Sequence, residues 1–333
     1  MTAGVELFDD WDAIEGAAAG ALDRASRPSL FERLSWFRLI AAYAPPAGRM
    51  LALRAGDAST WLFLAVDGAQ ARAYVNWYSL RFSAIGGDPN ALSDIARRLR
   101  SESRRLSRVE LSPLAPRDPL PQAFREAGWL TFVTPATASW RLDTEGMDFD
   151  TYWAGRGSRL RNTARRKAKA VSLDIVIHTG FDPAAWADYE RVYAVSWKPA
   201  EGSPAFLRAL AEQEGAAGTL RLGIARKDGE PIAAQLWLVE DGVATIHKLA
   251  YSEAARDLSP GTLLSVEMFR RALDVDKVRH VDFGTGNDPY KAEWMDGSKM
   301  LERMIAFNPA TLNGLAGAAR AMASALVRHT RSN

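Results

Sequence analysis

The stretch DLSPGTLLSVEMFRRALD, residues Asp257–Asp274, predicts a helix that begins abruptly after a loop. Ser259 stands where an N-cap side chain would be, and Pro260 occupies the first helical position, where its missing N–H is harmless. Gly261 follows inside the helix, although glycine lowers helix stability there. One face of the helix is formed by Thr262, Val266, Phe269 and Leu273. We therefore expect this helix to pack against a sheet.

The first turn of this helix also has the properties of an anion-binding site. Its amides, from Gly261, Thr262 and Leu263, are expected to lack intrahelical partners and to carry the positive end of the helix dipole. A glycine at this point removes the side chain that would hold a phosphate at a distance. Taken alone, the stretch is compatible with either an ordinary capped helix or a phosphate-binding loop.

The composition of the chain restricts the class of protein. Of its 333 residues, 47% are hydrophobic and 25% are charged, as in soluble globular proteins. The net charge of +2 gives no reason to expect a nucleic-acid-binding protein. Cysteine is absent, which excludes disulfides, cysteine metal ligands and thiol nucleophiles. The 4 histidines have no ligand spacing, so we expect no metal site.

The termini and the apolar runs bear on where the protein works. No apolar run approaches the roughly 20 residues that a membrane-spanning helix needs. The N-terminal segment MTAGVELFDDWDAIEG is acidic and lacks the basic region of a signal peptide. We therefore expect a cytoplasmic protein that is either free or in peripheral contact with the inner face of the cytoplasmic membrane.

The pattern of strands and helices divides the chain into two halves. The first half predicts the order β-β-β-α-β-α-β-β, with WLTFVTPATASWRLD as two strands, and the second predicts β-α-α-β-β-β-α-β-α-β. Asp228–Gly229 and Asp241–Gly242 mark tight hairpin turns in the second half. The shared order suggests a degenerate duplication. We predict one domain over residues 1–145, a second over 146–310, and a C-terminal amphipathic helix or tail over 311–333.

Two motifs carry a resemblance to a known family. KLAYSEAARDLSPGTLL, followed by VDFGTGNDPYKAEWM, resembles the acetyltransferase-like domain linked to the cellulose-biosynthesis CelD proteins and to the Fem-type peptidyltransferases of the GNAT superfamily. The resemblance covers roughly Asp148 to Phe307, and the first half matches only as the partner domain of Fem-like proteins. It implies a mixed α/β sheet in tandem GNAT-like domains, of which the N-terminal one is degenerate and the C-terminal one carries the acyl-CoA site.

The same resemblance implies which residues bind acyl-CoA. The pyrophosphate would lie on the loop Ser259–Leu263, that is, on Ser259, Pro260, Gly261, Thr262 and Leu263, with Arg256 and Leu249 also in the site. The usual signature is Gln/Arg-x-x-Gly-x-Gly/Ala, and this chain departs from it with Arg256 and the single Gly261.

N-acyl transfer requires an amine to lose a proton, an oxyanion to be held and a thiolate to be protonated. Because there is no cysteine, direct attack of the amine on the thioester is the simplest scheme. By resemblance, the strand VATIHKLAY would supply backbone N–H groups to the thioester carbonyl. His247 on that strand is either the general base or a structural histidine. Asp282 either orients a base or the amine, or caps a neighbouring backbone group.

Other candidate residues lie around the same motifs. Tyr290 stands where similar GNAT enzymes have a tyrosine that protonates the thiolate. Lys291 is expected to neutralise the thiolate, to pair with a CoA phosphate, or to form a salt bridge only. We expect the acceptor amine to be bound by Trp197, Lys198 and Asn287. The Gly284–Gly286 pair is a weak signal for a dinucleotide site, since the third glycine is missing.

The acceptor class is not specified by a motif. Seven basic residues in RGSRLRNTARRKAKA form either a solvated helix face or a surface for an anionic membrane, CoA phosphates or tRNA; they are Arg156, Arg159, Arg161, Arg165, Arg166, Lys167 and Lys169. We predict an acyl-CoA-dependent N-acyltransferase acting on a primary amine of an envelope lipid, a long-chain sphingoid base or an amino sugar. The alternatives are a Fem-like aminoacyl-tRNA-dependent peptidyltransferase and a non-catalytic polysaccharide-biosynthesis subunit.

Overall fold

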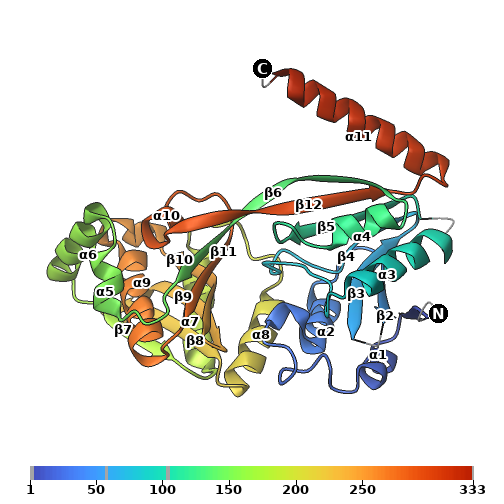
Figure 1. Cartoon of the computed structure of the whole chain (residues 1–333). Helices are drawn as coiled ribbons and strands as arrows, with labels where there is room; N and C mark the ends of the chain where they lie inside the picture. Colours follow the sequence, from blue (N-terminus) through green and yellow to red (C-terminus); the bar gives the residue numbers. More distant parts are fainter. Residues whose placement is uncertain (1–3, 57–58, 103–105, 332–333) are drawn as a thin grey trace. The chain divides into compact units, whose positions relative to one another are not determined.

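The helices and strands form two units (Figure 1), which the computed structural model describes over residues 4–56, 59–102 and 106–331. The first unit consists of the chain up to Thr137 together with the segment from Met300 onward, and the second unit is Ala138–Lys299. Both combine helices with a mixed sheet, as predicted. All the candidate site residues lie in the second unit.

In the first unit, the strands pair in the order β1-β2-β3-β4-β5-β12. Their bounds are β1 Glu6–Phe8, β2 Arg49–Ala55, β3 Thr60–Asp67, β4 Gln70–Ala73, β5 Arg108–Leu114 and β12 Gly297–Phe307. The helices are α1 Trp11–Ala18, the 3₁₀ helix η1 Leu30–Glu32, α2 Leu34–Tyr43, α3 Pro89–Glu102, α4 Leu120–Glu126 and α11 Leu312–Arg331. The β4–β5 pair is parallel and the other pairs are antiparallel.

In the second unit, the order is β7-β8-β9-β10-β11-β6. The strands are β6 Leu130–Asp143, which belongs to this unit from Ala138 onward, β7 Asp174–His178, β8 Leu220–Lys227, β9 Glu230–Glu240, β10 Val243–Tyr251 and β11 His280–Thr285. The helices are α5 Phe149–Ala154, α6 Ser158–Ala170, α7 Pro183–Ala194, α8 Pro204–Ala216, η2 Glu253–Leu258, α9 Pro260–Arg270, the π-helical turn η3 Arg271–Val275 and α10 Lys291–Trp294. Here β10–β11 is the parallel pair.

The two units have the same topology. Each has four antiparallel strands, then a parallel neighbour, then a final antiparallel strand. Two α-helices lie between the first and second strands, and one α-helix connects the parallel pair. The last strand in each order follows an element of the other unit in sequence. Strand β6 follows α4 of the first unit but pairs with β11. Strand β12 follows α10 of the second unit but pairs with β5. The predicted tandem fold is therefore confirmed.

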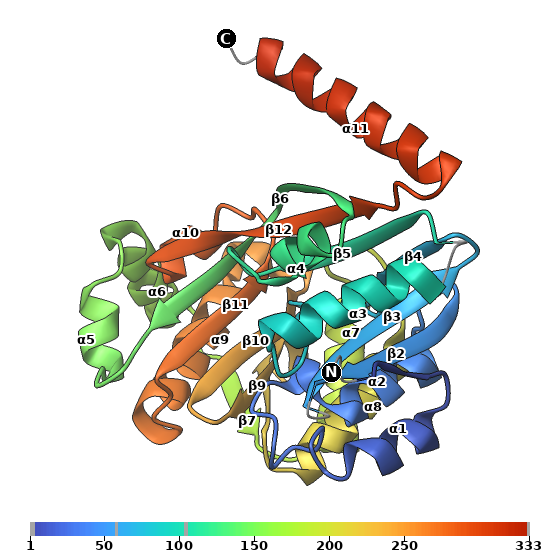
Figure 2. The ribbon, with the colours of Figure 1, turned by 45° about the vertical axis from the view of Figure 1, so that its right-hand side comes forward.

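Helices cover both faces of the second sheet (Figure 2). Helix α9 packs with α5 and α6 over one face, where Trp237 of β9 meets Phe269 of α9 at a ring distance of 5.1 Å. Helix α7 lies against β8, β9 and β10 on the other face. Apolar residues at helical spacing on α9 and at alternate positions on β9 produce this arrangement.

Some sequence-based boundaries were wrong. WLTFVTPATASWRLD forms the single strand β6 rather than two strands. Pro135 lies outside the part of β6 that pairs with β11, Ser139–Asp143, so its missing N–H removes no bond to that strand. Helices α1 and α2 were not predicted. Most of the basic segment forms α6, which begins after Gly157, whereas α5 ends before this segment at Ala154.

Replacement of Phe269 by Ala is expected to destabilise the second unit by about 3–5 kcal/mol. The ring is fully buried and stacks on Tyr152 and Trp294 at 4.9 and 5.2 Å, so its loss leaves a cavity. Urea unfolding at constant m-value measures the change. Val275→Ala, at a 63% exposed position, is the control and should shift stability by less than about 0.5 kcal/mol. A change below about 1 kcal/mol for Phe269→Ala would contradict this packing.

Candidate active site

The start of α9 is partly different from the expectation. Ser259 has left-handed backbone angles, φ 54° and ψ 45°, and its side chain makes no capping hydrogen bond. The amides of Thr262 and Leu263 donate to the Ser259 carbonyl at 3.1 and 3.2 Å. Leu263 is the fourth residue after the N-cap and so makes the first regular helix bond. The expectation of three unpartnered amides was therefore wrong for Thr262 and Leu263. For Gly261, the third of these amides, the described residues show no such bond.

Packing explains why residue 261 is a glycine. A Cβ atom there would lie 3.0 Å from the ring of Tyr251, which ends β10. The side-chain nitrogen Nε2 of Gln235 donates to the Gly261 carbonyl at 3.3 Å and to the Ser265 hydroxyl at 2.7 Å. The glycine therefore brings the helix start against the end of β10, whether or not a phosphate binds.

Replacement of Gly261 by Ala is expected to destabilise the fold by about 1–3 kcal/mol, because the new methyl group overpacks against Tyr251. Urea unfolding measures the change. In a Tyr251→Ala background the ring is absent, and the same substitution should stabilise by about 0.5–1 kcal/mol through its helix propensity. Equal effects in both backgrounds would show that the Tyr251 ring is not the cause.

The parallel strands β10 and β11 pair over a short register only. Their register runs from Val243–His280 to Thr245–Asp282, whereas β10 continues to Tyr251 in contact with β9. The β9–β10 register shifts between Ile246 and Lys248, so His247 lies at a bulge. Beyond Thr245, β10 therefore has no β11 partner among the described residues, and backbone donation to a thioester carbonyl requires such an unpaired strand edge.

His247 is a buried residue of this bulge. Only 9% of it is exposed, and burial, assisted by the charge of Lys248, lowers the pKa of His247 to about 3. The ring is therefore neutral near pH 7 and a weak proton acceptor. Its environment favours the structural alternative over the general base.

Asp282 is engaged with its own strand. It is buried, accepts a hydrogen bond from the Gly284 amide at 2.9 Å, and lies 3.9 Å from the Arg141 guanidinium. These contacts correspond to the backbone-capping alternative. They hold the turn at Gly284 that directs the following loop.

Tyr290 and Lys291 are consecutive residues at the end of the loop after β11. Lys291 is 5% exposed, donates to the Thr285 carbonyl at 2.6 Å and lies 3.7 Å from Asp288, while burial lowers its pKa. It therefore holds the loop. Tyr290 packs on Phe283 at 5.8 Å, and burial with the nearby Asp288 charge raises its pKa, so that the hydroxyl stays protonated.

The loop after α7 reaches the end of β10. Trp197 packs on Tyr251 at a ring distance of 4.2 Å, and Ser196 pairs with Ser252 in an isolated bridge. Lys198 lies 5.7 Å over the Trp197 ring, and burial, followed by repulsion from Lys248 and Lys291, lowers its pKa to about 8. Lysines tuned into this range serve as general bases.

The remaining candidates are more scattered. Leu249 is partly buried against the core, Arg256 is exposed on η2, and Asn287 is exposed in the loop after β11. Sequence reasoning missed Tyr251, which connects the helix start, Trp197 and Tyr290, although it lies within the quoted motif. It also missed the Glu201–Lys248 ion pair at 3.0 Å, which no local pattern indicates.

The basic segment is mostly a solvated surface. Five of its side chains belong to exposed residues: Arg159, Arg161, Arg165, Arg166 and Lys169. Arg156 instead donates to the Trp294 carbonyl at 3.0 Å, and Lys167 donates to the Asp257 carbonyl beside the start of α9. Within residues 4–56, 59–102 and 106–331, no group of His, Asp or Glu side chains could hold a metal ion. None of the helices described is long and apolar enough to cross a bilayer.

The fold is built on a mixed α/β sheet, and the family model that the sequence matches is one of acyltransferase enzymes. Residues 156–292 match the family described as the Acetyltransferase (GNAT) domain. The predicted relationship to the GNAT superfamily is thus confirmed. No curated protein matches the sequence of the chain.

Several solved structures have a similar fold. One is the C-terminal domain of a protein named as a lysylphosphatidylglycerol synthetase from Agrobacterium fabrum, with a TM-score of 0.60 and 13% identity over 92% of this chain and 95% of that chain. FemX has a TM-score of 0.58 and 9% identity over 90% and 96%. L-PGS from Bacillus licheniformis has a TM-score of 0.54 and 11% identity over 81% and 90%. At these identities the similarity shows the fold alone.

Proposed function

We propose that the second unit transfers an acyl group from acyl-CoA directly to a primary amine. The observation that carries this proposal is a set of contacts around Tyr251 at the end of β10. Its ring packs on Trp197, over which Lys198 lies, it meets Gly261 at the start of α9, and it lies near Tyr290. A proton acceptor, a proton donor and a carbonyl-binding backbone are the groups that aminolysis of a thioester needs.

The start of α9 is the proposed site for the CoA pyrophosphate. Supporting features are the GNAT domain itself, the helix dipole, the Gly261 amide and the exposed Arg256 nearby. Ser259, Pro260, Thr262 and Leu263 form the surrounding backbone. Since Thr262 and Leu263 already bond to Ser259, fewer amides are available than the sequence suggested.

The proposed reaction balances as ammonium plus thioester giving amide, CoA thiol and one proton. Lys198 accepts a proton from the ammonium, and the amine nitrogen forms the C–N bond at the carbonyl carbon. Backbone N–H groups of β10 donate to the carbonyl oxygen as the C–S bond breaks. Tyr290 donates its proton to the leaving thiolate, and the second proton lost from nitrogen restores the Tyr290 hydroxyl.

We place the acceptor among envelope lipid amines, long-chain bases and amino sugars. The name of the Agrobacterium fabrum relative points to a lipid, which agrees with this class. We further propose that the protein works in the cytoplasm and that the exposed basic face of α6 contacts an anionic membrane surface. The division into domains at 1–145, 146–310 and 311–333 stays a prediction.

An aminoacyl-tRNA donor is the second candidate function. The exposed basic residues of α6 favour it, since they would suit a phosphate backbone. RNase treatment separates the two donors, because only transfer from tRNA would be lost.

The test of the proposal is the release of CoA thiol, followed with a thiol reagent, when acetyl-CoA or a longer acyl-CoA is mixed with primary amines. We expect release only when both substrates are present. Calorimetry or a thermal shift with CoA checks donor binding separately. If acyl-CoA neither binds nor reacts, the proposal is wrong.

A further inference from the structure

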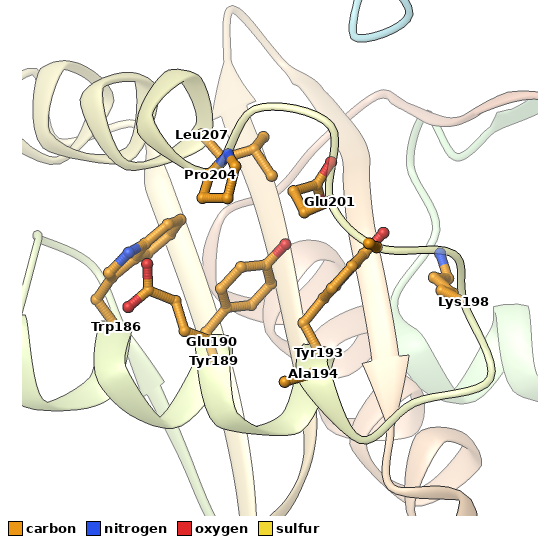
Figure 3. Close-up of a pocket in the computed structure, with 10 residues that line it drawn as sticks. Trp186, Tyr189, Glu190, Tyr193, Ala194, Lys198, Glu201, Pro204 and Leu207 are labelled. Atoms are coloured by element: carbon orange, nitrogen blue, oxygen red, sulfur yellow. The ribbon is translucent and has the colours of Figure 1, made fainter.

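A groove with a volume of about 560 Å³ lies along α7 in the second unit (Figure 3). Its floor is a row of aromatic rings at helical spacing, in which Trp186 stacks on Tyr189 at 4.7 Å and Tyr189 meets Tyr193 at 6.0 Å. Pro204 and Leu207 of α8 form the opposite wall. The volume is within the range of about 300–1,000 Å³ typical of small-molecule sites.

The groove is apolar at one end and polar at the other. Figure 3 shows Trp186 at the end far from Lys198, with Glu201 and the Tyr193 hydroxyl nearer to Lys198. Burial and the carboxylate of Glu201 raise the pKa of Tyr193 to about 12, so this phenol remains a hydrogen-bond donor. An elongated ligand with one polar end matches this distribution. An amino sugar, which is polar on every side, does not.

The charges of the groove depend on pH. Glu201 is paired with Lys248, which cancels both charges. Burial lowers the pKa of Lys198 to about 8, so this side chain is neutral above that pH. The carboxylate of Glu190, which is exposed on the lining, then leaves the groove with a net negative charge that favours a cationic ligand.

The polar end of the groove adjoins the proposed transfer site. Lys198 lines the groove and also lies over Trp197, whose ring packs on Tyr251 beside Gly261. A ligand whose apolar part lies against the α7 rings would thus have its head group next to Lys198.

We propose that this groove binds the apolar chain of a linear amphiphilic primary amine, with the ammonium at the Lys198 end. The inference rests on the proposed function and deepens it, because it selects the long-chain amines among the acceptor classes. The row of Trp186, Tyr189 and Tyr193 provides the apolar surface, and the Lys198 end positions the amine for transfer.

The test uses calorimetry on the full chain with dodecylamine and butylamine as probes. Dodecylamine is expected to bind at least about 100-fold more tightly, since its additional methylenes are buried in the groove. Ala194→Trp fills the groove from an exposed position of α7 and should weaken dodecylamine binding at least about tenfold. Ala187→Trp, exposed on the same helix outside the lining, is the matched control and should bind like the wild type.

The outcomes separate this inference from the proposed function. Equal binding of both amines, or tight dodecylamine binding in Ala194→Trp, overturns the groove assignment. The assignment is also overturned if Ala194→Trp weakens the binding of dodecanoyl-CoA but not of acetyl-CoA, because the acyl chain would then occupy the groove. The expected binding pattern without CoA release from any amine supports the groove but contradicts the proposed transfer. CoA release with equal kcat/KM for both amines supports transfer and contradicts the groove.

Discussion

Tyr290→Phe is expected to lower kcat for CoA release by on the order of 10²–10⁴, the usual contribution of a positioned general acid. The variant keeps the ring, which packs on Phe283 at 5.8 Å, and loses only the hydroxyl. Because the raised pKa keeps Tyr290 protonated in the wild type, the rate should not fall at neutral pH through loss of this proton. The KM for acyl-CoA should stay unchanged, and steady-state assays with a thiol reagent measure both constants.

Two comparisons make the Tyr290 result specific. Tyr251→Phe keeps the ring that packs on Trp197 and Gly261, and should leave kcat within about threefold of the wild type. A thioester with a strongly acidic thiol needs no protonation of its leaving group, so Tyr290→Phe should hardly slow its reaction. An equal loss with both thioesters would indicate a positioning role instead of proton donation.

Lys198→Met is expected to lower kcat/KM for the amine by on the order of 10²–10⁴ above about pH 8. Burial lowers the pKa of Lys198 to about 8, so the side chain is protonated below pH 8 and cannot accept a proton there. Above pH 8 it is neutral and active. The wild-type rate should therefore rise with pH and level off above about 8, and this part of the pH profile should be absent in the variant.

Lys198→Arg distinguishes a base from a positive charge. The guanidinium keeps the charge but cannot be deprotonated, so a loss as large as that of Lys198→Met is expected. Activity retained in Lys198→Arg would show that the charge alone matters. Lys169→Met removes an exposed lysine of α6 and is the control, for which kcat/KM should be unchanged.

Much of the second unit was predictable from local patterns. Hairpin turns at Asp228–Gly229 and Asp241–Gly242 place three antiparallel strands in order, and Pro260 marks the start of α9 because only the first helical turn tolerates proline. The reason for Gly261 was not predictable. The Tyr251 ring that occupies the space of its Cβ comes from the preceding strand, and the chain between them conceals the contact.

The candidate chemistry was only partly predictable. His247 has an ordinary pKa that suits a base, but its place at a buried bulge lowers that pKa to about 3. The opposite holds for Lys198, an unremarkable basic residue in sequence that burial and two neighbouring lysines make less basic. A pKa depends on desolvation and on charges distant along the chain, so no local pattern reports it.

The sequence by itself determined the class of fold, the duplication of strand order and the start of α9, because these depend on short-range periodicity and turn residues. The tertiary structure decided which groups meet. It placed Trp197 against Tyr251, buried His247, paired β6 with β11 and β12 with β5, and formed the groove along α7. Burial and contact between segments far apart in the chain arise only when the sheet forms, and these set the basicity and the neighbours on which the proposed transfer depends.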